Sequence, residues 1–124
     1  GAPDAAIAGG RARIAALLAT APAEPGVVLC CAWAALTTRL GDLASGAGWL
    51  ARARAQASDP PRLRDAEAMA LAEARLAAAT GNWDAADRAY GAAIGAQQQG
   101  GRHWYASRTQ AEREAMIRNG HAVP

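Results

Sequence analysis

Residues 80–94 have the sequence TGNWDAADRAYGAAI, and this stretch decides the fold class. Gly81 is typical of a tight turn, and Asn82 is typical of the N-cap residue that starts a helix. After the cap, apolar residues recur at spacings of three and four, with polar residues between them. This period indicates an amphipathic α-helix that buries one stripe of side chains. The stripe consists of Trp83, Ala86, Ala89, Tyr90, Ala93 and Ile94.

The remainder of the chain divides into similar helical stretches. No alternating strand pattern occurs and β-branched residues are few, so we expect an all-α fold in one domain, residues 1–124. Gly1-Ala2-Pro3 is compatible with residues left by a cloning vector. Asp4 is the expected N-cap of the first helix, and Gly120 is the expected end of the sixth. Breakers place the helices at about residues 4–20, 26–40, 42–57, 60–80, 82–99 and 103–119.

The sequence also repeats itself after forty residues. The shift aligns turn glycines, helix caps and apolar positions of the same character, as expected for an array of helix pairs. Small residues on the second helix of each pair allow the two helices to touch, and one large residue fills the space between pairs. The aligned positions are Gly41 with Gly81, Asp42 with Asn82, Leu43 with Trp83, Leu50 with Tyr90, and Ala53 with Ala93.

Residues 80–93 resemble the second helix of a tetratricopeptide repeat (TPR). Ala86, Tyr90 and Ala93 match the small, large and small positions of that family, and the earlier copy has Gly46, Leu50 and Ala53. The repeat is longer than the usual length of about thirty-four residues. It is similar to the longer repeats of large bacterial LuxR-type regulators and signalling ATPases. The resemblance covers residues 27–120 and implies a right-handed α-solenoid of stacked antiparallel helix pairs.

Composition argues against several classes of function. The net charge is only +2, and all thirteen basic residues are arginines that interleave with acidic ones, so we expect no direct contact with nucleic acid. The chain has no phosphate-binding glycine loop and no metal-binding motif, so we expect no enzyme, cofactor or metal. The adjacent Cys30 and Cys31 are expected to be buried, reduced thiols. Without a signal peptide or membrane span, the protein is expected to be cytoplasmic.

The resemblance implies a scaffold that binds protein or peptide on a concave face lined by the first helix of each pair. Several arginines on that face would favour an acidic segment, unless they are simply scattered solvated charges. Trp104 follows a glycine turn and is the expected exposed contact residue. The family's groove positions fall on Arg39, Arg75, Arg108, Glu112 and Arg118.

Two other functions remain open. A small-molecule-sensing domain of a transcription regulator would hold its ligand against Trp33, Cys30 and Glu73. Glu73 departs from the TPR pattern, and the alternative is that it pairs with a nearby arginine. A small α-helical enzyme is the less favoured alternative. Asp65 and Glu67 are expected to lie on an exposed face as solvated charges.

The sixth helix leads to a prediction about self-association. In the repeat register it is the first half of a third pair, so Trp104, Tyr105, Met116 and Ile117 can be buried only partly against the fifth helix. We expect a weak homodimer through the fifth and sixth helices. Sedimentation over a range of concentrations will show a rising average mass. A strict monomer at high concentration would instead indicate that the sixth helix folds back as a cap.

Overall fold

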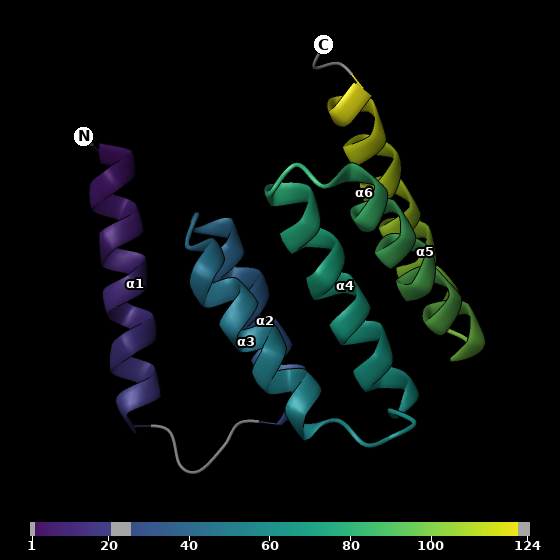
Figure 1. The fold of residues 1–124 in the computed structure, drawn as a ribbon, viewed down its shortest axis with the longest axis horizontal. Helices are drawn as coiled ribbons and strands as arrows, with labels where there is room; N and C mark the ends of the chain where they lie inside the picture. The colour runs from purple at the N-terminus through teal and green to yellow at the C-terminus, as the bar shows by residue number, and fades with distance from the viewer. Residues whose placement is uncertain (1, 21–25, 122–124) are drawn as a thin grey trace.

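The computed structural model describes residues 2–20 and 26–121, and these residues form six α-helices and no strand. The predicted all-α class is therefore confirmed. Consecutive helices run antiparallel, and the described segments nearest the two termini lie at the same end of the molecule (Figure 1). The helices are α1 (Ala2–Thr20), α2 (Val27–Arg39), α3 (Leu43–Gln56), α4 (Leu63–Ala79), α5 (Trp83–Gln99) and α6 (His103–His121).

The forty-residue relation has a structural basis in the turns. Gly41 and Gly81 have φ angles of +83° and +78°, a backbone region that favours glycine. In both turns the glycine N–H donates to the carbonyl three residues earlier, and the next N–H donates to the carbonyl five residues earlier. This is the Schellman motif that ends helices. Asp42 and Asn82 then cap the following helices by accepting from the N–H groups of Ser45 and Ala85.

Three predicted helix ends were wrong. α1 begins at Ala2, before Asp4, and α4 begins at Leu63, after a cis peptide bond between Asp59 and Pro60. α6 continues through Gly120, which packs against α5 instead of ending the helix. A side-chain carbon at position 120 would lie 2.9 Å from the ring of Trp83 on α5. The prolines at positions 22 and 25, expected to end the first helix, lie outside the described residues.

The core consists of two apolar clusters that share α4. One cluster joins α4 to α2 and α3, and the other joins it to α5 and α6. Ala72 of α4 belongs to the first cluster, and Ala74 belongs to the second. Figure 1 shows α4 between these two groups of helices. The helix therefore contacts neighbours on two sides, through buried alanines and through the partly buried Met69, Leu71 and Leu76.

The small residues predicted to lie between paired helices are all buried. Gly46 lies against α2 and also near Leu76 of α4, and Ala53, Ala86 and Ala93 have no exposed surface. Leu50 of α3 and Tyr90 of α5, the large residues at the matching position of the two repeat copies, are buried as predicted. The alanine-rich sequence thus produces closely spaced helices, since small side chains let helix axes approach.

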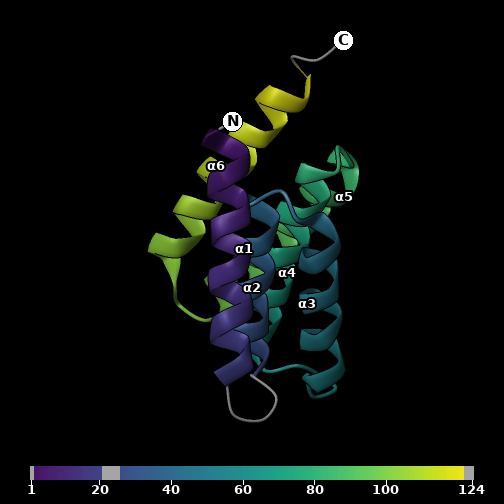
Figure 2. The same ribbon diagram turned by 90° about the vertical axis from the view of Figure 1, so that its left-hand side faces the viewer.

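The two outer helices are packed differently. α1 lies beside the turn between α2 and α3, where Gly10 contacts Leu40 and Ile14 is buried (Figure 2). α6 buries Met116 against α5 but leaves Trp104 and Tyr105 exposed. The predicted partial burial of the sixth helix is therefore confirmed.

The two cysteines are free and buried, as predicted. Burial raises the pKa of the Cys31 thiol to about 11, and the neighbouring Cys30 and Asp65 add to this effect. The thiolate is the nucleophilic form, so Cys31 is a core residue with little reactivity. No helix among the described residues combines the length and hydropathy that crossing a membrane requires.

Two glycines of α3 provide a matched test of the close packing. We expect Gly46→Leu to lower the free energy of unfolding by about 1–3 kcal/mol, because the new side chain would collide with Thr38 of α2. Gly48 has no atom near its missing side chain, so Gly48→Leu is expected to stabilise the helix by roughly 0.5–1 kcal/mol. Urea unfolding of both variants measures the difference. Similar effects at the two positions would contradict the close contact at Gly46.

Candidate functional site

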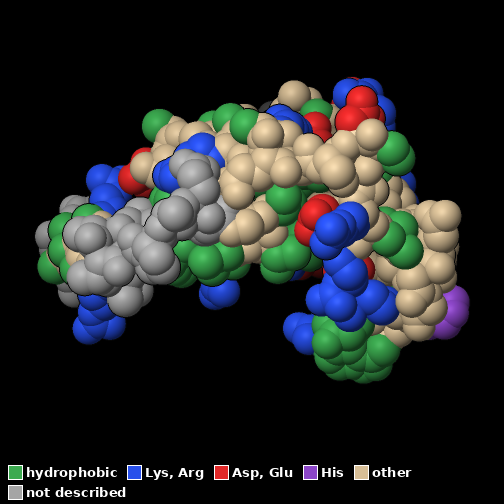
Figure 3. Space-filling view, turned by 90° about the horizontal axis from the view of Figure 1, so that it is seen from below, with side chains coloured by type: hydrophobic (Ala, Val, Ile, Leu, Met, Phe, Trp, Pro, Cys, Tyr) green, Lys and Arg blue, Asp and Glu red, His purple; other side chains and the backbone are tan. Residues whose placement is uncertain are grey.

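Two adjoining cavities form a groove along α2, α4 and α6. The first, about 660 Å³, lies between α2 and α4, and the second, about 510 Å³, lies between α4 and α6. Arg75 and Glu112 line both cavities, so the groove is continuous at this pair. Seen from below in Figure 3, the surface is hollowed beside a group of arginine side chains. Helices of the same direction in the antiparallel array therefore build the concave surface.

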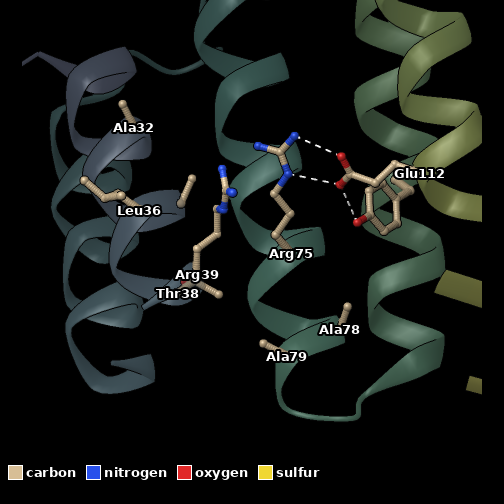
Figure 4. A pocket seen from close by; sticks show the side chains of 10 residues that line it. Ala32, Leu36, Thr38, Arg39, Arg75, Ala78, Ala79 and Glu112 are labelled. Atoms are coloured by element: carbon tan, nitrogen blue, oxygen red, sulfur yellow. Dashed lines mark hydrogen bonds and ion pairs between the residues drawn. The ribbon is translucent and has the colours of Figure 1, made fainter. Parts of the chain in front are cut away.

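A three-residue clasp stands at the centre of the groove. The Nε and Nη2 atoms of Arg75 donate to the two carboxylate oxygens of Glu112, and both N···O distances are 3.0 Å. The hydroxyl of Tyr90 donates to Glu112 Oε2 at an O···O distance of 2.6 Å. Figure 4 shows the guanidinium of Arg75 facing the carboxylate of Glu112, with dashed lines marking the bonds between them. The clasp links α4, α5 and α6, and its two-pronged geometry fixes the carboxylate in one orientation.

The electrostatics of the clasp favour an ionised acid beside a neutral phenol. Burial alone would raise the pKa of Glu112, but the hydrogen bonds from Arg75 and Tyr90 outweigh it, and the pKa is lowered. Burial raises the pKa of Tyr90, and the hydrogen bond to Glu112 raises it further. Burial alone would lower the pKa of Arg75, but the hydrogen bond to Glu112 and its negative charge outweigh this effect, and the pKa is raised. The charges of Arg75 and Glu112 therefore cancel within the groove.

A second ion pair lies in the cavity between α4 and α6. Arg102 donates to both carboxylate oxygens of Glu67, at N···O distances of 2.9 and 3.4 Å. Its guanidinium also lies 3.9 Å from the ring centre of Tyr105. The expectation that Glu67 is a solvated charge was wrong, since the residue is buried with 8% of its surface exposed. Local sequence gave no sign of this burial, because the partner is thirty-five residues away.

The structure brings most of the predicted contact residues together. Arg39 is exposed at the edge of the first cavity, and Arg108 lines the second, where its guanidinium lies 5.0 Å from the ring centre of Trp104. Trp104 itself is 61% exposed. Arg118 is exposed on α6 but lines neither cavity. Neither Arg39 nor Arg108 forms an ion pair with another described residue, whereas Arg75 is neutralised by the clasp.

The residues proposed to hold a small ligand are separated from this groove. Glu73 is half exposed and pairs with Arg54 of α3 over 3.1 Å, as the alternative interpretation of this residue expected. Cys30 is completely buried in the cluster of α2, α3 and α4, and Trp33 packs against that cluster. The carboxylate of Glu73 thus lies at the surface while Cys30 lies in the core.

Comparisons with known proteins add no relative to this description. No protein-family model, curated protein or solved structure matches the chain. Within residues 2–20 and 26–121, no three histidine, cysteine or acidic side chains are grouped so that they could hold a metal ion. The geometry and charge of the groove are therefore the basis for assigning a function.

The lowered pKa of Glu112 leads to a pH-dependent prediction. Because the folded pKa lies below the ordinary value of 4.5, the ionised clasp stabilises the fold above that pH, and its contribution is lost as the pH falls through the folded pKa. Glu112→Gln should lower the free energy of unfolding by about 1–2 kcal/mol at pH 7, a moderate figure because the pair is partly exposed.

Urea unfolding at pH 7 and pH 3 provides the test. The difference between wild type and Glu112→Gln should shrink at pH 3, because below 4.5 the unfolded chain takes up a proton at this carboxyl and the advantage of the ionised clasp is progressively lost. Glu114→Gln is the control, since Glu114 is exposed on the same helix and, among the described residues, accepts a hydrogen bond only from Gln110. An equal loss of stability at both pH values would show that the charge of Glu112 is not what stabilises the clasp.

Proposed function

We propose that this chain is a TPR-like scaffold whose groove along α2, α4 and α6 binds an acidic segment of a partner protein. The observation that carries the proposal is the pair of available arginines in a concave surface whose central charges are already neutralised. Arg39 lies on the α2 side of the clasp and Arg108 lies on the α6 side. An extended segment that follows the groove passes both guanidinium groups.

The charge distribution gives the groove its selectivity. The clasp and the pair of Glu67 with Arg102 each contribute no net charge, so the positive potential comes from Arg39 and Arg108. Guanidinium groups bind carboxylates through two parallel hydrogen bonds, which favours aspartate or glutamate side chains. Trp104 is exposed next to Arg108 and provides an apolar surface at the same end.

Membership of the TPR-like class is part of the same proposal. The matching turns at Gly41 and Gly81, the buried small residues of α3 and α5, and the groove on alternate helices support it. In a right-handed solenoid, stacked helix pairs share their cores and present the first helix of each pair on the concave side. We further propose, on the sequence resemblance alone, that the parent protein is a bacterial regulatory or signalling protein.

Charge reversal tests the groove. A fluorescein-labelled decapeptide of glutamate, serine and glycine is titrated with the protein at low salt, and its polarisation is measured. Arg39→Glu and Arg108→Glu should each weaken binding by about tenfold, because each replaces attraction with repulsion. The effect should diminish as salt is added.

Two variants serve as controls for this titration. Arg88 is exposed on α5 and lines neither cavity, so Arg88→Glu should leave affinity nearly unchanged, and the same is expected for Arg118→Glu. Circular dichroism melting confirms that each variant folds. Equal losses in all four variants would indicate a response to net charge alone. Unchanged affinity in Arg39→Glu and Arg108→Glu would remove the groove from the proposal.

A further inference from the structure

Gln97 is a buried polar side chain with an unmet hydrogen bond. It is 2% exposed, and its Oε1 atom has no hydrogen-bond partner among the described residues. The residue belongs to α5 but lines the cavity between α4 and α6. Buried polar groups nearly always find a partner, so an unmet one beside a cavity requires an explanation.

The fold itself does not require an amide at this position. Three turns of the chain have the same pattern, in which the carbonyls of Thr37, Ala77 and Gln97 accept the N–H of the residue five positions later. The hydroxyl of Thr37 is satisfied by carbonyls of its own helix, and Ala77 has no polar group to satisfy. Only Gln97 carries a long polar side chain with an unmet acceptor at this turn position. Alanine at the equivalent place shows that the turn forms without it.

The surroundings of Gln97 suggest the chemistry of a ligand. Thr109 of α6 is also buried and lines the same cavity. The ion pairs of Glu67 with Arg102 and of Arg75 with Glu112 lie in its walls, and their charges cancel. Arg108 is exposed and its guanidinium lies over the ring of Trp104, so an ionised side chain beside the buried Gln97 would leave water next to ion pairs that are already neutral, which is costly. A neutral polar group is therefore preferred.

We propose that this cavity is a subsite for one primary carboxamide side chain, glutamine or asparagine, of the segment bound in the groove. The proposal rests on the proposed function and adds a specificity to it. A primary carboxamide carries both a donor and an acceptor, so it pairs with the amide of Gln97 whichever way that amide is turned. Arg108 stands in the same cavity, so the preferred segment has a carboxylate near the carboxamide.

A direct test uses small probes on the whole protein labelled with ¹⁵N. N-acetylglutamine N-methylamide, whose side chain is its single primary carboxamide, is titrated, and the side-chain NH₂ signal of Gln97 is followed by two-dimensional NMR. We expect a saturable shift with this probe and none with the N-methylamides of N-acetylglutamate or N-acetylleucine, which carry no primary carboxamide. An unmoved Gln97 signal, or equal shifts with all three probes, would mean that water alone satisfies Gln97 and would overturn the subsite.

Peptides test the same preference within the groove. Acidic decapeptides that differ only in a central glutamine or leucine are compared by polarisation. Wild type should bind the glutamine peptide at least fivefold more tightly, and Gln97→Leu should abolish that ratio. Gln98→Leu, at an exposed neighbouring position, should retain it. A preference that survives Gln97→Leu in a folded variant would overturn the proposal.

The two proposals fail in distinguishable ways. If acidic peptides bind without a preference for glutamine, the groove is retained and the subsite is rejected. If no acidic peptide binds but N-acetylglutamine N-methylamide shifts Gln97, the subsite is retained and the acidic-segment function is rejected. The NMR titration needs no substitution, so it decides the subsite even if Gln97→Leu fails to fold.

Discussion

The close packing of α4 between two sets of helices is the constraint on which the structure depends. Ala72 and Ala74 are its buried apolar side chains, and they belong to different core clusters. Alanine lets neighbouring helix axes approach, and the neighbours also present small residues such as Gly46 and Ala86. Larger α4 side chains, Met69 and Leu76 on one side and Leu71 on the other, pack around these alanines and are only partly buried.

The groove follows from that arrangement. Arg75 and Glu67 extend from α4 toward the side of α6, and their partners Glu112 and Arg102 lie thirty-seven and thirty-five residues later in the chain. Both ion pairs span the cavity between the two helices. Their charges cancel at the centre, and the groove arginines without an ion pair to another described residue are Arg39 and Arg108. Packing thus positions the helices, while polar side chains give the groove its chemical character.

Sequence reasoning was most successful where local rules act. The helices, the glycine turns at 41 and 81, and the buried small residues followed from period, cap and propensity. Glu67 was misplaced and the unmet amide of Gln97 was missed, since burial of a polar group depends on residues remote in sequence. Gly120 was taken for a helix end because a glycine that ends a helix and one that accommodates a ring look alike. The pairing of Arg75 with Glu112 also depends on tertiary contact, although both residues were named as groove candidates.

Arginine is the basic partner in every ion pair between described residues, and this has a chemical consequence. A guanidinium group stays protonated far above neutral pH, so the bridges to Glu67, Asp87 and Glu112 retain their charge in alkaline solution. The chain has no lysine, and its side chains therefore present no primary amine. Acetylation or ubiquitination of lysine has no target in this sequence. A covalent change near the groove would therefore act on other groups of this sequence, such as its hydroxyl, carboxyl or guanidinium groups.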